Sequence, residues 1–388
     1  MSLSTSASRL RLTLYALLAL AQWAWLFRVV PALHGNDFGI FYRSAASTQP
    51  YVGHPGNPTT GDGQLLTNLN PPHFLLVLKP FTLLPLVAAC VVWWLLSLGL
   101  IVAGLTWWLR TQGERWTIER AIWAALWAPV LTMGFTGQVT AVLGVAVWLA
   151  YRNLRRGHDW RGGAWLGLVL SVKPILWPLA IWFVVRREWK AVFGMAAAGA
   201  ASVAIGLAVF GLRTYWMWIG ALRGIDWGQE AMNASISGIA SRLPIHVPHA
   251  ASLLVGFAVA CTTVWRSRGW TLDRAWMPLV AASLLASPLG WVYYGVWLLP
   301  GTSIAQWTKG VARFWCAPLI VVIGIGNLSA GLWASVGCCY GWTLLAMWYR
   351  SGVVRTAQVG PLYRALHPSA SSRWETREVA GTNAHRIA

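Results

Sequence analysis

The sequence predicts an all-α polytopic membrane protein, a bundle of about 10–12 transmembrane or re-entrant helices with a large first external loop. Of its 388 residues, 57% are hydrophobic and 11% are charged, whereas about a quarter of the residues in a soluble domain are charged. Apolar runs long enough to cross a hydrocarbon core of about 30 Å recur along the chain. These runs are continuous rather than alternating, which favours helices over a barrel.

Aromatic and charged residues also follow a membrane pattern. The 29 Trp residues gather near the ends of apolar runs, as at 93–94, 107–108 and 216–218, which is typical of interfacial anchoring. The net charge of +19 comes from short basic clusters between the runs, as on the cytoplasmic side of membrane proteins. We therefore expect membrane lipids, and no nucleic acid, as partners. The five Cys residues lie in apolar stretches and are expected to be small buried side chains.

The basic clusters predict the topology. Arg9 and Arg11 precede the first apolar run, so the N-terminus is expected in the cytoplasm and the run as an uncleaved anchor. Residues 1–350 would form one transmembrane domain, and 351–388 a cytoplasmic tail that is expected to be disordered. The expected spans are 12–30, 84–109, 118–134, 138–151, 189–211, 250–265, 274–287, 290–306, 312–328 and 330–349, and the expected external loops are 31–71 and 212–249.

Residues 162–185 do not fit a single span, because basic clusters flank this apolar segment on both sides. Pro174 interrupts a helix at its middle and disfavours helical geometry at Lys173. Two half-helices of about 11 residues reach about 16 Å, roughly half of the membrane. We therefore expect a re-entrant hairpin that enters from the cytoplasm, with Lys173 near its tip.

Asp37 is the strongest candidate for chemistry, since acidic residues are rare on the expected external side. It follows the first span and begins an amphipathic, aromatic segment. A carboxylate there could accept a proton from a substrate at the membrane surface, or it could be a solvated loop residue or a helix cap. Arg43 and Tyr42 follow closely. Arg43 could hold a phosphate while Asp37 accepts a proton, or the two could form an ion pair.

Four further polar positions lie in apolar surroundings. Asn70 and His73 flank two prolines before an apolar piece, where they could bind a substrate or simply begin an interfacial helix. Gln138, in the outer turn between two spans, could bond a sugar hydroxyl or cap a helix. Lys173 could hold a lipid phosphate, because ionisable groups at membrane depth are costly and often functional. It could also bond the carbonyls that Pro174 leaves unpaired.

Five stretches, in this order, resemble glycosyltransferase family 87, a bacterial branch of the GT-C fold. They are NDFGIFYRSA, NPPHFLLVLKPFTLLP, FTGQVTAVLGVAVWLAYR, GAWLGLVLSVKPILWPLAIWFVVRREWK and SPLGWVYYGVWLLP, and they cover roughly residues 10–305. That family contains polyprenyl-phosphate-mannose-dependent α-mannosyltransferases and related arabinofuranosyltransferases. The resemblance implies an enzyme of the bacterial inner membrane that moves a hexose, mannose above all, from a polyprenyl phosphate to a lipid or glycan acceptor outside the cytoplasm.

The resemblance also implies roles for single residues. Asp37 would be the general base of one inverting displacement, in which the lipid phosphate leaves without needing a proton. The lipid-linked sugar is then a co-substrate, and no cofactor or metal is expected. Members often carry Tyr-Pro-Pro where this chain has 70–72. They often carry a His pair where this chain has Tyr293 and Tyr294, which are expected to contact substrate without an imidazole.

The transferred sugar could instead be arabinofuranose, as in an arabinofuranosyltransferase of the same fold, and two functions outside sugar transfer also fit the sequence. A flippase for a polyprenyl-phosphate-linked sugar would also use a re-entrant segment with a buried Lys173, although no internal repeat or paired intramembrane acid is visible. A scaffold subunit of an envelope-glycan complex that has lost catalysis would explain the absence of the His pair. Sugar transport without consumption of an acceptor would distinguish the flippase from the enzyme.

Overall fold

The structure, a computed structural model, describes residues 2–29, 37–58, 65–223 and 232–301. Within these ranges the regular elements are helical, apart from an isolated bridge between Asn233 and Trp291, which confirms the predicted all-α class. The elements are α1 (Ser2–Val29), α2 (Asp37–Ala46), η2 (Pro72–Phe74), α3 (Leu75–Leu78), η3 (Lys79–Leu83), α4 (Leu86–Thr111), α5 (Ile118–Ala125), α6 (Ala128–Thr136), α7 (Thr140–Arg155), α8 (Asp159–Val172), η4 (Pro174–Leu176), α9 (Trp177–Val185), α10 (Trp189–Arg223), α11 (Ile236–Ser241), α12 (His249–Ser267), α13 (Leu272–Ala286) and η5 (Val292–Gly301).

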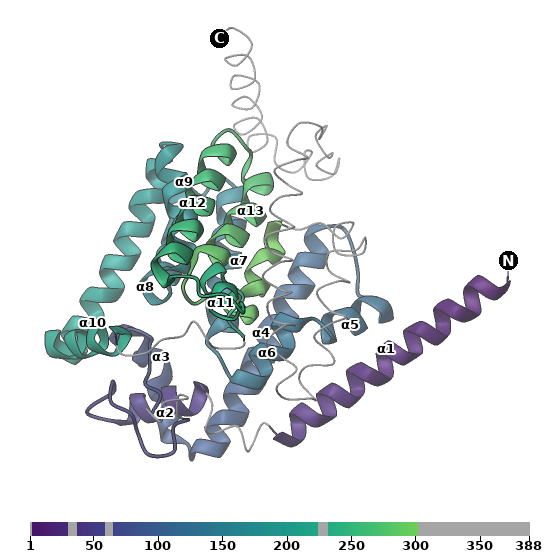
Figure 1. Ribbon diagram of the computed structural model, residues 1–388, viewed down its shortest axis with the longest axis horizontal. Helices are drawn as coiled ribbons and strands as arrows, with labels where there is room; N and C mark the ends of the chain where they lie inside the picture. Colours follow the sequence, from purple (N-terminus) through teal and green to yellow (C-terminus); the bar gives the residue numbers. More distant parts are fainter. Residues whose placement is uncertain (1, 30–36, 59–64, 224–231, 302–388) are drawn as a thin grey trace, which may run out of the picture.

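Four of the described helices are long and apolar enough to cross a membrane. They are α4, α10, α12 and the part of α1 from Arg9 to Arg28. The protein is therefore a multi-pass membrane protein, and the shorter helices fill the space beside α4, α10 and α12 (Figure 1). The predicted spans at 312–328 and 330–349, and the predicted tail, lie outside the described residues.

Three predicted elements differ from the structure. The span expected at 118–134 is divided into α5 and α6, because Pro129 stands in the first turn of α6 and cannot continue a preceding helix. The span expected at 290–306 begins as the 3₁₀ helix η5, which is buried among α6, α7 and α13. The first part of the loop expected at 212–249 is helical and continues α10 beyond a kink.

Two predictions about side chains, that the Trp residues lie at interfaces and that the Cys residues are buried, are each wrong in part. Trp93, Trp94 and Trp108 are buried inside the bundle instead of lying at its edge, because α4 turns these rings towards neighbouring helices. Trp216 is exposed as expected. Cys90 is buried, but Cys261 is exposed. A cysteine in an apolar helix is therefore buried only where it faces a neighbouring helix.

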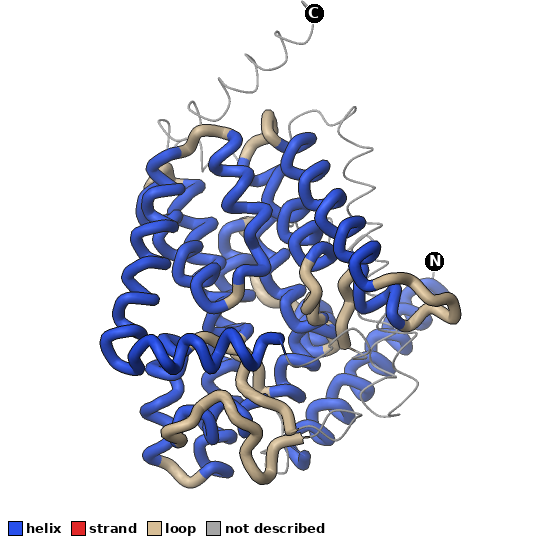
Figure 2. The backbone as a smooth tube through the Cα atoms, turned by 60° about the vertical axis from the view of Figure 1, so that its left-hand side comes forward, coloured by secondary structure: helices blue, strands red, loops and turns tan. Residues whose placement is uncertain are grey.

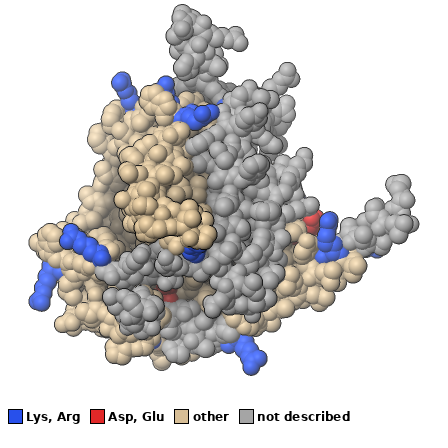
Figure 3. All heavy atoms as spheres, viewed as in Figure 1, with Lys and Arg blue, Asp and Glu red and all other residues tan. Residues whose placement is uncertain are grey.

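One end of the bundle is held together by contacts between basic residues and helix termini. Arg155 at the end of α7 pairs with Asp273 in the first turn of α13 at 3.0 Å. Arg186, just after α9, donates to the backbone carbonyls of Arg268 and Trp270 at 2.7 and 2.9 Å. In Figure 3 basic side chains lie beside α10 and lower on this face as well as at the upper edge, near α9 and α12. The end that Arg155 and Arg186 hold together is the one that the basic clusters assign to the cytoplasm.

The segment 162–185 is two short helices, α8 and α9, joined through η4. Lys173, at the junction, has extended backbone geometry (φ −135°, ψ 98°), as expected for a residue before proline. The N-terminal end of α8 and the C-terminal end of α9 both lie next to the start of α10. Trp160 of α8 contacts Gly194 of α10, and only three residues separate the end of α9 from Trp189. The segment therefore turns back at Lys173, as a re-entrant hairpin would, and its depth in a membrane stays a prediction.

Glycine allows α8 and α10 to lie against each other along their length. A Cβ atom at Gly163 would collide with the backbone of Ala191, and one at Gly167 with the backbone of Met195. Small residues at such spacing let two membrane helices approach closely, where van der Waals packing replaces the hydrophobic effect. This contact holds α8, and with it Lys173, in place.

Helix α10 bends sharply at Gly211, whose φ of 73° is in the left-handed region that favours glycine. Figure 2 shows the part after Gly211 crossing the bundle at a steep angle to the first part. The second limb, 212–223, thereby passes over the loop that precedes η2, on the end of the molecule opposite Arg155.

Candidate active site

Asp37 begins α2, at the end of the bundle away from the basic cluster. A carboxylate in the first turn of a helix is stabilised by the positive end of the helix dipole. The next residues anchor α2, because Phe38, Ile40 and Phe41 are buried while Asp37 is half-buried. The carboxylate is thus held on a packed helix, and it does not lie in the solvated loop that the sequence left possible.

Gln138 reaches Asp37 from the turn between α6 and α7. Its side-chain Nε2 donates to Asp37 Oδ2 at 2.6 Å, across 101 positions of the chain. Gln138 is 7% exposed, and its Oε1 has no hydrogen-bond partner among the described residues. The amide therefore orients the carboxylate and offers a buried acceptor atom beside it.

The turn that carries Gln138 can approach α2 because residue 137 is glycine. Gly137 has φ of 66°, and a Cβ atom there would lie 2.9 Å from Cβ of Phe38. Trp93 of α4 donates from its indole Nε1 to the Gly137 carbonyl oxygen at 2.8 Å. Three elements thus meet at one backbone position, and Gln138 follows it directly.

Lys173, Tyr293 and Tyr294 are close enough to Asp37 to interact with its charge. Lys173 is an opposite charge, which favours the ionised carboxylate. The two tyrosine rings are buried and meet edge to face, with centroids 4.9 Å apart. Their hydroxyl groups interact with each other. The structure therefore brings Gln138 into contact with Asp37, and it places Lys173, Tyr293 and Tyr294 within range of the charge of Asp37.

Tyr42 and Arg43 turn away from this group. The Tyr42 hydroxyl donates to the Leu84 carbonyl oxygen at 2.7 Å, and Arg43 Nη1 donates to Asn57 Oδ1 at 3.0 Å. Partial burial lowers the pKa of the Arg43 guanidinium. The pKa of the neighbouring His54 is lowered by burial and by the charge of Arg43. These contacts stabilise the loop around Asn57.

Asn70 and His73 lie under the second limb of α10. Asn70 is buried, and its Oδ1 has no partner among the described residues, although Tyr51 donates to its backbone oxygen at 2.8 Å. His73 Nδ1 lies 3.0 Å from the Tyr215 hydroxyl. Burial lowers the pKa of His73, and the Ser171 carbonyl opposes this effect. Since Ser171 is two residues from Lys173, His73 faces the junction of α8 and α9.

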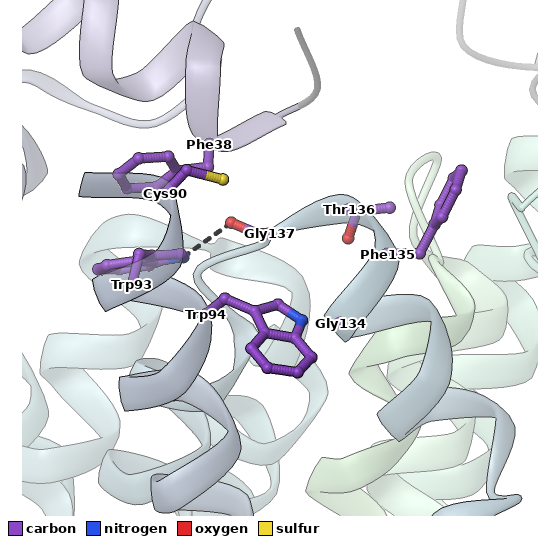
Figure 4. A pocket seen from close by; sticks show the side chains of 8 residues that line it. All are labelled: Phe38, Cys90, Trp93, Trp94, Gly134, Phe135, Thr136 and Gly137. Carbon is purple, nitrogen blue, oxygen red and sulfur yellow. Dashed lines mark hydrogen bonds between the residues drawn. The ribbon is translucent and has the colours of Figure 1, made fainter. Parts of the chain in front are cut away.

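A small hollow is lined by Phe38 and Gly137, the sequence neighbours of Asp37 and Gln138 (Figure 4). Rings of Phe38, Trp93 and Trp94 line it, and Phe135 at its rim points away from the others. Its remaining lining is Cys90, Gly134, Thr136 and Gly137. Trp93 and Trp94 were expected at the interface and not in the site, although their position as the eighth and ninth residues of a long apolar helix was the available signal that they are internal.

The described ranges hold no cluster of three or more His, Cys, Asp or Glu side chains that could bind a metal ion. The chemistry of the described site is that of one carboxylate, one amide, one ammonium group and the hydroxyl groups of Tyr293 and Tyr294, with the single imidazole of His73 near the junction of α8 and α9. Such a set can accept a proton from a hydroxyl group and bind an anion.

Comparison with known proteins identifies the family. The sequence profile of glycosyltransferase family 87 matches residues 68–288, more than half of the chain. The chain belongs to glycosyltransferase family 87. The family match includes Asn70, His73, Gln138 and Lys173, whereas Asp37 precedes it and the two tyrosines follow it.

Curated relatives in glycosyltransferase family 87 are distant but extend over most of the chain. The chain is 26% identical to a polyprenol-phosphate-mannose-dependent alpha-(1-2)-phosphatidylinositol mannoside mannosyltransferase of Mycobacterium tuberculosis, over 82% of this chain and 86% of the relative. It is 29% identical to a polyprenol-phosphate-mannose-dependent alpha-(1-2)-phosphatidylinositol pentamannoside mannosyltransferase of Mycolicibacterium smegmatis, over 59% of this chain and 58% of the relative. No solved structure matches.

Proposed function

We propose that this family 87 enzyme transfers a mannosyl residue from polyprenyl phosphate mannose to a lipid or glycan acceptor on the non-cytoplasmic side of the membrane. The donor is supported by the names of the relatives, which use polyprenol phosphate mannose. The side of the membrane is supported by the position of Asp37, which lies at the end of the bundle opposite the basic contacts of Arg155 and Arg186.

The observation that carries the proposal is the Asp37 carboxylate, oriented by Gln138 at 2.6 Å and placed near Lys173. In the proposed reaction, the acceptor hydroxyl gives its proton to Asp37 as its oxygen forms a bond to the anomeric carbon. The bond from that carbon to the phosphate oxygen breaks, and the phosphate leaves with the electron pair. One displacement inverts the anomeric configuration, and a single carboxylate suffices because phosphate leaves without protonation, unlike the leaving group in glycoside hydrolysis.

The other groups have roles that match their chemistry. Lys173 would bind the phosphate as a point charge. Gln138 Oε1, buried beside the carboxylate, would accept a hydrogen bond from a sugar hydroxyl, and the hydroxyl groups of Tyr293 and Tyr294 would bond further sugar oxygens.

Asp37→Asn tests this proposal. Asn keeps the size of the side chain and is also favourable at a helix start, but it cannot take a proton from the acceptor. We expect at least a 1,000-fold loss of transfer, on the order of the contribution of a general base, measured by mass spectrometry of products from polyprenyl phosphate mannose and an acceptor panel.

Asp159→Asn is the matched control, because Asp159 also begins a helix but lies at the opposite end of the bundle. It should transfer at the rate of the unmodified protein. Full activity in Asp37→Asn would refute the base assignment. Movement of labelled donor across vesicles, with no acceptor consumed, would instead identify the protein as a flippase.

A further inference from the structure

The chain just before Tyr293 is paired with a segment that lies far from it in the sequence. Asn233 and Trp291 form an antiparallel bridge, and the N–H groups on either side of this pair donate across the bridge at 2.9 and 3.2 Å. A bridge of two bonds is too short to be stable without other contacts. We call residues 232–242 the clamp segment, because further bonds from it reinforce the bridge.

The side chain of Asn233 supplies the first of these bonds. Asn233 is fully buried. Its Nδ2 donates to the Pro288 carbonyl oxygen at 2.7 Å, and its Oδ1 accepts from the Ser235 N–H at 3.2 Å. A carbonyl can only accept and a backbone N–H can only donate, so the two contacts fix which way the amide points. Asn233 thereby ties the turn before Trp291 to the start of α11.

Arg242 and two glycines hold Asn233 in turn. Arg242 Nη2 donates to the Asn233 carbonyl oxygen at 2.7 Å, and the charge of the guanidinium strengthens this bond. A Cβ atom at Gly238 would lie 2.5 Å from the same oxygen, and one at Gly290 would lie 3.0 Å from Cβ of Ser235. Glycine at both positions thus lets the clamp segment lie against the chain around residue 290.

Trp291 passes this constraint on to the two tyrosines. Its ring stacks on that of Tyr293, with centroids 6.0 Å apart and planes at 21°, and its carbonyl oxygen accepts from the Tyr294 N–H at 3.1 Å. Both tyrosines lie in η5, a 3₁₀ helix of 10 residues, whereas such helices rarely exceed three or four residues. The start of η5 therefore depends on contacts from outside it, and Val292, its first residue, donates to the clamp segment at 3.2 Å.

We propose that Asn233 is a positioning residue, which holds the hydroxyl groups of Tyr293 and Tyr294 where they meet the transferred sugar. It acts through the backbone of residues 288–291. Because both tyrosines are within range of the charge of Asp37, a shift of this backbone would change their distance from the reacting centre. The proposal deepens the proposed function, on which it rests for the role of the two tyrosines.

Asn233→Ala removes the amide that bonds to the Pro288 carbonyl. We expect kcat/KM for transfer from polyprenyl phosphate mannose to fall about 10-fold, the worth of two neutral hydrogen bonds. In a background with both Tyr293→Phe and Tyr294→Phe, the same substitution should not lower kcat/KM further, because the hydroxyl groups that it displaces are gone. The melting temperature in detergent should fall equally in the two backgrounds. A merely structural role would lower kcat/KM by the same factor in both, and that result would overturn the proposal.

Arg242→Gln covers the case in which Asn233→Ala does not fold. It removes the guanidinium that donates to the Asn233 carbonyl and keeps the amide of Asn233. The value of kcat/KM should fall about threefold, as for one neutral hydrogen bond, and again only where the tyrosine hydroxyl groups are present. An equal fall in the background without them would count against the positioning role.

Asn153→Ala is the matched control. Asn153 Nδ2 also donates to a backbone carbonyl at 2.8 Å, that of Leu149, but it lies in α7 at the end of the bundle near Arg155. This variant should leave kcat/KM unchanged in both backgrounds. A fall as large as that in Asn233→Ala would show that the loss is not specific to the clamp segment.

A second measurement does not depend on transfer. Protein labelled with fluorotyrosine should give ¹⁹F resonances for Tyr293 and Tyr294, assigned through the two Phe variants. At least one of them should move in Asn233→Ala, and neither should move in Asn153→Ala. If this holds but no polyprenyl phosphate sugar is used, the proposed function fails and the positioning of the tyrosines stands. If transfer occurs and neither resonance moves in Asn233→Ala, the positioning role fails alone.

Discussion

At the scale of single residues, the environment of the candidate base Asp37 is set by side chains from other parts of the chain, Gln138 and Lys173. Asp37 could be predicted from the sequence, because an acid in an aromatic segment next to a span is rare. Gln138 and Lys173 could be predicted as polar residues in apolar surroundings, but their approach to Asp37 depends on how three helices fold. Tyr42 and Arg43 were grouped with Asp37 because they are near in sequence. Helical periodicity of about 100° per residue already places both on other sides of α2.

Gln138→Leu tests the orienting role of the amide. The substitution removes the donor to Asp37 Oδ2 and keeps similar volume, so kcat/KM should fall about 10- to 100-fold, the range for a hydrogen bond to a charged group. Steady-state transfer assays would measure this. Gln112→Leu, at the exposed end of α4, should behave like the unmodified protein. Equal rates in both variants would show that Asp37 acts without the amide.

At the scale of elements, glycine and proline decide where the helices break and how closely they pack. The sequence predicted the turn at Lys173–Pro174, because proline acts locally and predictably. It did not predict the second limb of α10, because a glycine at position 211 can either end a helix or bend it. Only the tertiary contacts of Tyr215 and Trp218 show that the helix bends and continues. Tyr215 was missed for this reason, although Gly206 and Gly211 in one apolar helix were a signal of close approach.

Gly167→Val tests the packing of α8 against α10. The larger side chain would collide with the backbone of Met195, so the helices must separate, at a cost of about 1–3 kcal/mol. The melting temperature in detergent should fall by several degrees for a cost of this size. Gly99→Val in α4 is the control, since a Cβ atom at Gly99 meets nothing within 4 Å. Similar melting temperatures for both variants would contradict the close packing.

At the scale of the whole molecule, the ends of the bundle carry different chemistry. Basic residues and helix termini hold one end together, and the other end carries Asp37, the loop at Asn57 and the second limb of α10. The sequence predicted this division from charge alone, because the membrane sorts basic loops to the cytoplasm. It could not predict how the polar residues converge at the end that carries Asp37, which depends on tertiary contacts.

Cysteine labelling tests the orientation of the two ends. In a background without native cysteine, Thr48→Cys should react with a membrane-impermeant maleimide in intact spheroplasts. His158→Cys, in the turn between α7 and α8, should react only after lysis. Both positions are exposed, so a difference in labelling reports the side of the membrane. The reverse pattern would place Asp37 in the cytoplasm.

The position of Gly137 affects which substitutions will reduce the activity of this protein. It carries no group that could react, yet its carbonyl holds Trp93, its missing side chain admits Phe38, and its neighbour is Gln138. An added methyl group would push the turn away from α2 and pull the amide off the carboxylate. We therefore expect substitutions at Gly137 to reduce turnover about as strongly as substitutions at Asp37, although Gly137 has no reactive group.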